Sequence, residues 1–362
     1  MDWSVRTAQK EDIMKKLSLY LLAFTVAAGA LAGCAGKKET KETLPVETEL
    51  TAADGETDGQ SGEESTESPV AAGEGGTVTV TYVKSPLNVP SIVEKDQAIF
   101  SDVFRALNYS VAYSDLTTGP EQTQALASGD IQFLNAVGAT SVILSASNGA
   151  DIKIISMYSR SPKAFKLFSK DGSIKTPLDL KGKKVAGPKG TILHELLVAY
   201  LKSADLTEDD IEFVSMGIPD SQAALVGGSV DAALLAGPAA YNMEKDGYAV
   251  VTDGEGFTDA TIVTATSGKF YEEHPELVKT FLTGQKKVLD YMKGSYEEAM
   301  AATAKETELT VDAVKEMYDM YDFDMEISDK DIEAMKNTEQ FMKDTGMIEH
   351  DVDVEGLILN IN

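Results

Sequence analysis

The chain has 362 residues, a formal net charge of −27 and one cysteine. Its length allows two domains with hydrophobic cores of their own. The acidic excess argues against a nucleic-acid partner, because phosphate backbones are bound by an excess of lysine and arginine.

The N-terminal segment has the order of a bacterial lipoprotein signal. Two lysines follow Met14, an apolar run comes next, and the run ends in Leu-Ala-Gly-Cys at Cys34. A basic start, an apolar centre and small residues before a cleavage point are typical of a secretory signal, and this ending resembles a lipobox. We therefore predict a mis-assigned start over 1–13, a signal peptide over 14–33, and a lipidated Cys34 that anchors the protein to a bacterial membrane outside the cytoplasm.

The segment after this cysteine, residues 34–76, is rich in Glu, Thr, Gly and Ser and almost free of large apolar side chains. Such a composition cannot bury enough apolar surface to fold. We expect a disordered acidic tether that holds a folded domain away from the membrane.

From residue 77 onward, strand patterns alternate with amphipathic helix patterns. The predicted strands span residues 77–83, 109–116, 131–137, 152–159, 183–187, 211–216, 231–236 and 248–253. The predicted helices among them span residues 91–107, 120–129, 141–149, 192–204 and 221–229. From about residue 270 the pattern is helical, with helices predicted over 274–292, 296–307, 311–321 and 329–346.

This alternation predicts an α/β fold with doubly wound, parallel sheets. The pattern forms two units of similar style, the second beginning near Asp171. Two such units with trailing helices indicate a cleft between two lobes. Ligands of open α/β sheets bind at the carboxyl ends of strands, where helix N-termini point.

Three collinear stretches, residues 117–133, 176–214 and 221–240, resemble the solute-binding lipoproteins of ABC importers. The most similar branch binds nitrate, aliphatic sulfonates, taurine and pyrimidine precursors of thiamine. The resemblance implies a type II periplasmic-binding-protein fold, a two-lobed Venus flytrap in which each lobe is a mainly parallel sheet. Lobe 1 would comprise 77–168 plus 262–362, with the C-terminal helices, and lobe 2 would comprise 169–261.

The same resemblance implies a function of capture and delivery rather than catalysis. The lobes would close over a small organic solute or anion, and the closed form would dock on a permease whose ATPase drives release. We expect a monomer without cofactor or bound metal. Two other classes stay open: a tethered ligand-sensing lipoprotein that is not coupled to transport, and an enzyme built on the same fold.

The implied ligand contacts lie where strands lead into helices. The ligand-binding residues carried over by position are Ser85, Pro86, Gly119, Gly138, Ala139, Thr140, Gly190, Thr191, His194, Ala236 and Gly237. At such positions unpaired backbone N–H groups and the positive end of the helix dipole favour an anion or a polar head group.

The chain departs from the family pattern after the predicted strand 231–236. Sulfonate binders often carry an aromatic and an acidic residue there, whereas this chain has Leu-Leu-Ala-Gly-Pro-Ala-Ala-Tyr. Arginine, which would clamp a carboxylate or phosphate in a bidentate way, is also scarce. The ligand therefore stays open among nitrate, a sulfonate, a pyrimidine and an aromatic acid.

Single residues allow more than one interpretation. The stretch Gly187–Thr191 lacks the spacing of a nucleotide-binding P-loop, so Thr191 either caps the next helix or also contacts the ligand. His194 is a candidate donor to the ligand, and Tyr82, Tyr158 and Tyr241 lie close to strand ends, where one or two could stack on it.

An acidic stretch near the C-terminus resembles a calcium loop. It spans residues 322–333, but Ile327 stands where such a loop requires glycine. We predict instead that Ser328 is a helix N-cap and that Asp331 completes a capping box.

Overall fold

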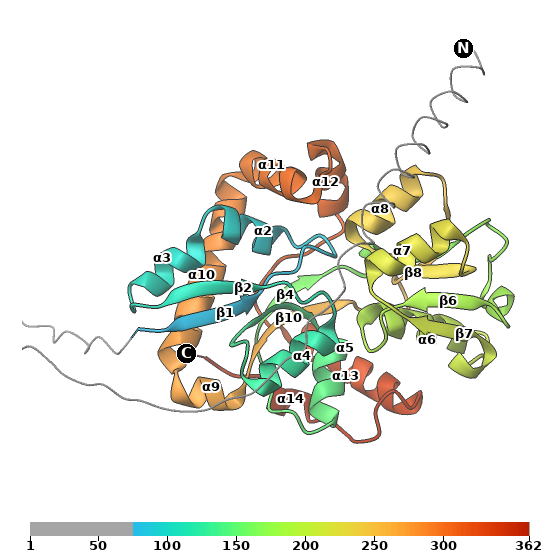
Figure 1. Cartoon of the computed structure of the whole chain (residues 1–362). Helices are drawn as coiled ribbons and strands as arrows, with labels where there is room; N and C mark the ends of the chain where they lie inside the picture. The colour runs from blue at the N-terminus through green and yellow to red at the C-terminus, as the bar shows by residue number, and fades with distance from the viewer. Residues whose placement is uncertain (1–74, 362) are drawn as a thin grey trace, which may run out of the picture. The chain divides into compact units, whose positions relative to one another are not determined.

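The computed structural model describes residues 75–361 (Figure 1). The predicted signal peptide, the lipidation at Cys34 and nearly all of the predicted tether lie outside the described residues. In the described part, no helix combines the length and apolarity needed to cross a membrane.

The first lobe is built around five strands, four of which run parallel to one another. These are β1 (Thr77–Thr81), β2 (Ser110–Ser114), β3 (Leu134–Gly138), β4 (Lys153–Arg160) and β10 (Thr261–Thr266). β1 pairs with β2 in parallel, and a bridge from Val80 to Phe133 links β1 to the start of β3. β10 lies between β3 and β4 and is antiparallel to both.

The second lobe is a five-stranded sheet in the order β7-β6-β8-β5-β9. Its strands are β5 (Phe165–Ser169), β6 (Lys184–Gly187), β7 (Glu212–Ser215), β8 (Ala232–Ala236) and β9 (Ala249–Asp253). β5 is antiparallel to its neighbours, while β6 pairs in parallel with β7 and β8. Each lobe therefore has a mainly parallel sheet with one antiparallel strand, and the predicted α/β architecture is confirmed.

The helices of the sheet-forming regions follow the strands in both lobes. In the first lobe they are α2 (Val89–Asp96), α3 (Ile99–Arg105), α4 (Gly119–Ser128) and α5 (Ala139–Ser147). In the second lobe they are α6 (Ile192–Lys202), α7 (Ile218–Gly227) and α8 (Gly237–Lys245), with 3-10 turns at Pro162–Ala164, Pro177–Leu180 and Glu208–Asp210.

The first change of sheet comes earlier than the predicted lobe boundary after residue 168. β5 already pairs with β8 and β9, so the chain leaves the first lobe between Arg160 and Phe165. A five-residue strand buried between two others carries no pattern that tells which sheet it joins. The return is at Thr261, where β10 begins.

The single helix predicted over 91–107 is two helices, α2 and α3. Ala98 between them has a φ of 54°, in the left-handed region, which interrupts the helix. The Glu94 carboxylate accepts a hydrogen bond from the N–H of Phe100 at 3.0 Å. A side chain of α2 thus satisfies one of the free N–H groups at the start of α3.

The C-terminal helices pack mainly on the first lobe. They are α9 (Gly268–Glu273), α10 (Pro275–Gly294), α11 (Tyr296–Thr307), α12 (Val311–Tyr318), α13 (Asp329–Asp344) and α14 (Val354–Leu357). The α10 residue Phe281 stacks on Phe133 with 4.2 Å between ring centroids, and it also packs on Phe100 of α3. These rings form an aromatic core under β1 and α3.

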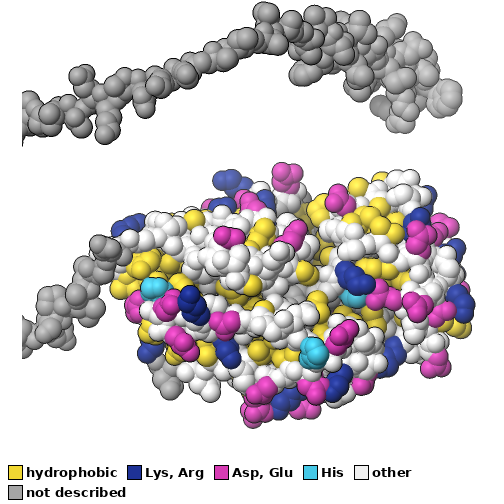
Figure 2. Space-filling model, turned by 60° about the horizontal axis from the view of Figure 1, so that its bottom comes forward, with side chains coloured by type: hydrophobic (Ala, Val, Ile, Leu, Met, Phe, Trp, Pro, Cys, Tyr) yellow, Lys and Arg dark blue, Asp and Glu magenta, His cyan; other side chains and the backbone are white. Residues whose placement is uncertain are grey.

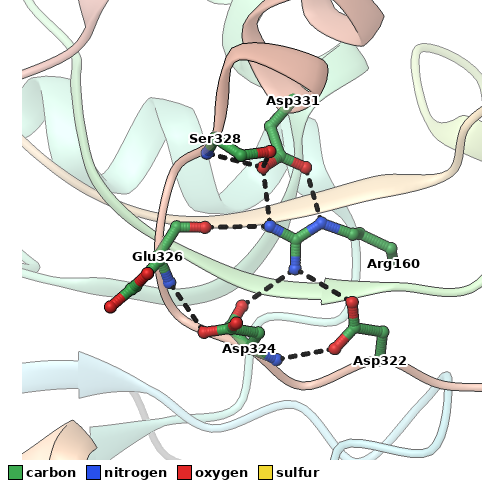
Figure 3. A network of polar contacts seen from close by, with 6 residues as sticks. All are labelled: Arg160, Asp322, Asp324, Glu326, Ser328 and Asp331. Atoms are coloured by element: carbon green, nitrogen blue, oxygen red, sulfur yellow. Dashed lines mark hydrogen bonds and ion pairs between the residues drawn. The ribbon is translucent and has the colours of Figure 1, made fainter.

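Arg160, the last residue of β4, holds the loop that precedes α13 (Figure 3). Its guanidinium donates to both carboxylate oxygens of Asp331, at 2.5 and 2.7 Å, and to the carbonyl oxygens of Asp324 and Glu326. Ser328 and Asp331 form the predicted capping box of α13. A guanidinium group thus supplies the positive charge among the acidic residues of the stretch that resembles a calcium loop.

The surface carries its charges in mixed order. On the face shown in Figure 2, Asp and Glu side chains lie among Lys, Arg and apolar ones. Several exposed pairs join C-terminal segments, among them Lys336 with Glu355 and Lys315 with Glu297. Exposed pairs of this kind contribute little stability each, so the buried cores described above hold the fold together.

Candidate ligand-binding site

A cavity of about 550 Å³ lies between the lobes and is lined by residues of both. Five of the predicted ligand-binding residues line it: Ser85, Pro86, Gly119, Gly138 and Thr191. Its volume is in the range of sites that hold small organic molecules.

The N-terminal ends of five helices converge on this cavity. The first lobe contributes α4 and α5, and the second lobe contributes α6, α7 and α8. The first N–H groups of a helix have no partner within it, and the helix dipole places a partial positive charge there. The convergence therefore makes the cavity suitable for an anion.

The donors are strongest at α5 and α6. Proline stands in the first turn of α4, α7 and α8 and removes one N–H from each, and α4 is also closed by a capping box between Thr118 and Glu121. Neither α5 nor α6 has proline in its first turn or a side-chain hydrogen bond at its N-cap, Gly138 and Thr191 respectively. Because α5 belongs to the first lobe and α6 to the second, each lobe brings one helix start without a side-chain cap to the cavity.

Thr191 lies at the N-cap position of α6, but its hydroxyl does not cap the helix. Its Oγ1 donates to the carbonyl oxygen of Pro188 at 2.8 Å. The interpretation of Thr191 as a side-chain cap is therefore wrong, because this turn draws the hydroxyl back toward its own loop.

Two predicted ligand-binding glycines do not line the cavity and lie at contacts between the lobes. A Cβ atom on Gly190 would be 2.8 Å from Cδ2 of Leu144, and one on Gly237 would be 2.9 Å from Cα of Pro86. Both glycines have positive φ values, 72° and 60°. Their missing side chains allow the lobes to approach each other.

The remaining predicted residues lie behind the cavity wall. Ala139, Thr140 and Ala236 are almost fully buried and do not line it. His194 is also buried. Its Nδ1 accepts a hydrogen bond from the N–H of Gly190 at 3.3 Å, and its Nε2 lies 2.9 Å from Glu208 Oε2. The imidazole thus supports the loop before α6 from behind.

A buried carboxylate joins the lobes beside the cavity. Glu195 of α6 accepts hydrogen bonds from the hydroxyl groups of Thr140 on α5, Thr338 on α13 and Thr258 ahead of β10. Burial raises the pKa of Glu195, and the three hydroxyl groups oppose that rise. These contacts tie the second lobe to the first without closing the cavity.

The charged residues of the cavity come from the first lobe and its C-terminal helices. They are Lys84, Asp115, Glu306 and Glu308. Lys84 Nζ lies 3.1 Å from Glu306 Oε1, and the Tyr82 hydroxyl donates to the same oxygen at 3.0 Å. Burial raises the pKa of Glu306, but the hydrogen bonds from Lys84 and Tyr82 lower it by more, so this carboxylate stays ionised.

Among the three candidate tyrosines, only Tyr82 lines the cavity. Lys95 Nζ lies over the Tyr82 ring, 3.8 Å from its centroid, in a cation–π contact. The Tyr158 hydroxyl instead bonds Ser91 in the core of the first lobe, and the Tyr241 hydroxyl donates to Glu316.

Four residues that line the cavity were not predicted from the sequence: Asp115, Gln122, Glu306 and Glu308. Asp115 lies one residue before the end of the predicted strand 109–116, and Gln122 lies in the first turn of the predicted helix 120–129. The rule that placed the other site residues could therefore have found both. Glu306 and Glu308 lie at the end of α11, in a helical region with no local sign of a site. Only the packing of α11 against α2 brings them to the cavity.

Comparison with known proteins agrees with this architecture. The profile of the NMT1/THI5-like family matches residues 104–299, more than half of the chain. The chain belongs to this family. A protein of Bacillus subtilis assigned to the binding of aliphatic sulfonates is 28% identical over 276 residues, which cover 75% of this chain and 82% of that protein. The taurine-binding periplasmic protein of Escherichia coli is 32% identical over 176 residues, which cover 48% of this chain and 54% of that protein.

Solved structures show the same fold. The alkanesulfonate-binding protein SsuA from Xanthomonas axonopodis pv. citri, bound to MOPS, superposes with a TM-score of 0.71 at 20% identity, covering 78% of this chain and 98% of that protein. The desulfurization enzyme DszB shares the fold at a TM-score of 0.58 and 15% identity, covering 78% of this chain and 96% of the enzyme. The predictions of the family, of a periplasmic-binding-protein fold and of a solute-binding protein are confirmed.

Proposed function

We propose that this protein captures a small organic sulfonate in the cavity between its lobes and delivers it to an ABC permease. The observation that carries the proposal is the pair of uncapped helix N-termini, α5 from the first lobe and α6 from the second, that meet in the cavity. A sulfonate has three oxygen atoms that spread in different directions, so it can accept N–H groups from both helices at once. The relatives that bind sulfonates and taurine support this choice.

Contacts to both lobes explain why the ligand would favour closure. A ligand shifts a two-state equilibrium only through contacts that differ between the two states. An anion held by α5 alone gains the donors of α6 when the lobes close, and the closed form presents both lobes to the permease. Closure around the anion is therefore the transport signal in this proposal.

The proposal assigns binding, not catalysis, to the cavity. Among the described residues that line it, none is histidine or cysteine. The nearby His194 is engaged by Gly190 and Glu208 on both ring nitrogens. A general base held in this way has no free position toward the cavity, which supports a binding role over the chemistry of an enzyme such as DszB.

The setting of this function is part of the proposal. It includes a monomer next to the permease and its ATPase, and the signal pattern and Cys34 support an anchor of lipid on the outer side of a bacterial membrane. A tether raises the local concentration of the protein at the permease.

Isothermal titration calorimetry of the purified chain tests the ligand class. Ethanesulfonate, 2-aminoethanesulfonate, nitrate, propionate and a pyrimidine would be titrated under one set of conditions. We expect at least one sulfonate to bind with a Kd on the order of 1 μM and the other classes to bind about 100-fold more weakly. A folded sample that binds neither sulfonate at millimolar concentration would overturn the proposal.

A further inference from the structure

We propose that capture of the anion takes up a proton from solvent, and that Glu195 holds this proton when the lobes close around the ligand. This inference rests on the proposed function, because it takes the anion to bind at the starts of α5 and α6. It adds a second ligand, the proton, whose binding residue lies outside the cavity that holds the anion.

Glu195 belongs to the second lobe and is buried by the first. It is the fourth residue of α6, and only 3% of its surface is exposed. Thr140 of α5 and Thr338 of α13 contact its carboxyl group from the first lobe, and Thr258 does so from the loop that leads back into that lobe. Separation of the lobes would therefore return this carboxyl group to water, and closure would bury it again.

The buried carboxyl group of Glu195 has no positive partner among the residues that the structure describes. Asp259, in the loop before β10, is the charged neighbour that acts on it, and it is another carboxylate. On α6 itself, His194 is paired with Glu208, and Lys202 lies over an aromatic ring of α13. The residues of α5 and α13 that bond the carboxyl group are uncharged threonines. Burial therefore raises the pKa of Glu195 above its ordinary value of 4.5, and Asp259 adds to the rise.

The bound anion gives a second reason for the proton. Glu195 lies in the first turn of α6, whose first two residues line the cavity, and its partner Thr140 is the second residue of α5. An ionised Glu195 would thus place a negative charge at the same two helix starts that hold the anion, where it opposes their attraction for the ligand. A proton on Glu195 removes this repulsion, so the anion and the proton each favour the binding of the other.

The hydrogen bonds around Glu195 suit a protonated carboxyl group. Its Oε1 accepts from the hydroxyl groups of Thr258 at 3.0 Å and Thr338 at 3.2 Å, while Thr140 is the partner of Oε2. A hydroxyl group can accept as well as donate. A proton on Oε2 would therefore be donated to Oγ1 of Thr140, and the contact between the lobes would be kept.

A cavity of about 320 Å³ beside Glu195 provides a route for the proton. Its lining includes the buried Glu195 and Thr338 and the exposed Gly256, Asp259 and Asn337. It shares no lining residue with the cavity between the lobes. Solvent can therefore exchange a proton with Glu195 without passing the anion.

Affinity for the anion should accordingly depend on pH. The closed form, in which burial raises the pKa of Glu195, holds a proton that the open form releases. Below the ordinary pKa of 4.5 both forms are protonated, and the affinity is at its highest. As the pH rises above this value the affinity falls by up to about tenfold per pH unit, because each anion bound requires a proton.

A pH-stat titration of the full chain in unbuffered solution at pH 6.5 counts the protons. Ethanesulfonate and 2-aminoethanesulfonate are the probes, because neither changes its own charge near this pH. We expect each bound anion to require up to about one equivalent of acid to hold the pH constant. Binding that requires no acid would overturn the proton inference and leave the proposed function standing. Binding of neither sulfonate would overturn the proposed function itself.

Glu195→Gln assigns the proton to this residue, because the amide keeps Oε1 as an acceptor and offers Thr140 an N–H donor in place of the acid proton. We expect this variant to take up no proton and to bind with the same affinity at pH 5.5 and pH 7.5, while the affinity of the parent falls at least about tenfold.

Glu94→Gln is the matched control for the loss of a buried carboxyl group. The Glu94 contacts with Phe100 and Tyr113 lie within the first lobe, so closure does not change them. This variant should take up as many protons as the parent. Proton uptake that persists in Glu195→Gln, or that is lost equally in both variants, would contradict the role of Glu195.

Discussion

At the scale of single residues, the two arginines of the described part have different structural roles. Arg105 and Arg160 are the arginines of the described part, and neither lines the cavity. Arg105 is exposed and pairs with Asp102 one turn away on α3. Arg160 is largely buried and binds Asp331 in the first turn of α13, together with the Asp322 carboxylate and the two carbonyl oxygens of the preceding loop. The Arg160 guanidinium is thus a structural clamp and contributes nothing to the cavity.

We therefore expect Arg160→Gln to lower the free energy of unfolding by about 3 kcal/mol, because it leaves the buried Asp331 carboxylate without its charged partner. Arg105→Gln is the matched control and should change stability by less than about 0.5 kcal/mol. Denaturant unfolding of both variants measures the difference. Similar values for the two would show that the clamp contributes no more than a surface pair.

Asp331 also gives this clamp a pH dependence. Burial raises the pKa of Asp331, but hydrogen bonds from Arg160 and Ser328 outweigh it and lower the pKa to about 2. The stability from this group is therefore present above the ordinary pKa of 3.8 and is lost as the pH falls toward 2.

Glu94 shows the opposite pH dependence. Burial raises the pKa of this carboxyl group from 4.5 to about 7, against the hydrogen bonds from the Phe100 N–H and the Tyr113 hydroxyl. The folded protein thus holds a proton that the unfolded chain releases, and the free energy of unfolding falls as the pH rises from about 4.5 to about 7.

Glu94→Gln is expected to remove the loss of stability at rising pH, and it keeps a side-chain oxygen that accepts from the Phe100 N–H. The variant should gain about 2–3 kcal/mol on the parent protein between pH 5 and pH 8. Unfolding curves of both proteins at the two pH values provide the measurement. A constant difference between them would mean that Glu94 is ionised across the whole range.

At the scale of elements, the close approach of α5 to α6 sets the geometry of the anion site. A Cβ atom on Gly138 would lie 3.2 Å from side-chain atoms of Ile192, in the first turn of the facing helix. A larger residue at Gly138 would therefore push the two N-termini apart and spread their N–H groups.

We expect Gly138→Val to weaken sulfonate binding by at least about tenfold, since both helices donate to one small anion. Thr191→Ala, which removes the hydroxyl that bonds Pro188, should weaken binding to a smaller extent. Gly227→Val at the far end of α7 has open space around it and serves as the control. If Gly138→Val binds as the parent does, the anion is not held between these helices.

At the scale of the whole folded part, glycines decide how closely the lobes can meet. Gly237 and Gly247 both have positive φ values, 60° and 85°, so alanine costs each about 1 kcal/mol of backbone strain. Only Gly237 faces the other lobe, at Pro86, while Gly247 is open.

Gly237→Ala and Gly247→Ala should therefore lose similar stability and differ in affinity. We expect ligand binding to weaken by at least about tenfold in Gly237→Ala alone, because the added methyl group holds the lobes apart at Pro86. Thermal unfolding and calorimetry of the two variants separate the effects. Equal ligand affinities of the two variants would show that the lobes close without bringing Gly237 against Pro86.

The sequence by itself determined most of the order of strands and helices, the α/β class and the family, and it predicted a site where strand ends meet helix starts. It did not predict β5, β10 or α8. The predicted features depend on local periodicity, which each segment carries within itself. Several predicted site positions, such as Ser85, Gly119 and Gly138, follow from the same rule, because strand ends in one sheet gather at one edge.

Only the tertiary structure decided the rest. It placed β5 in the second sheet, turned Gly190 and Gly237 into contacts between lobes, directed His194 toward Glu208, and brought the end of α11 to the cavity. Each of these depends on pairing between segments far apart in the chain. Such pairing leaves no periodic pattern in either segment, so Glu306 and Glu308 could not be assigned to the cavity before the helices were packed.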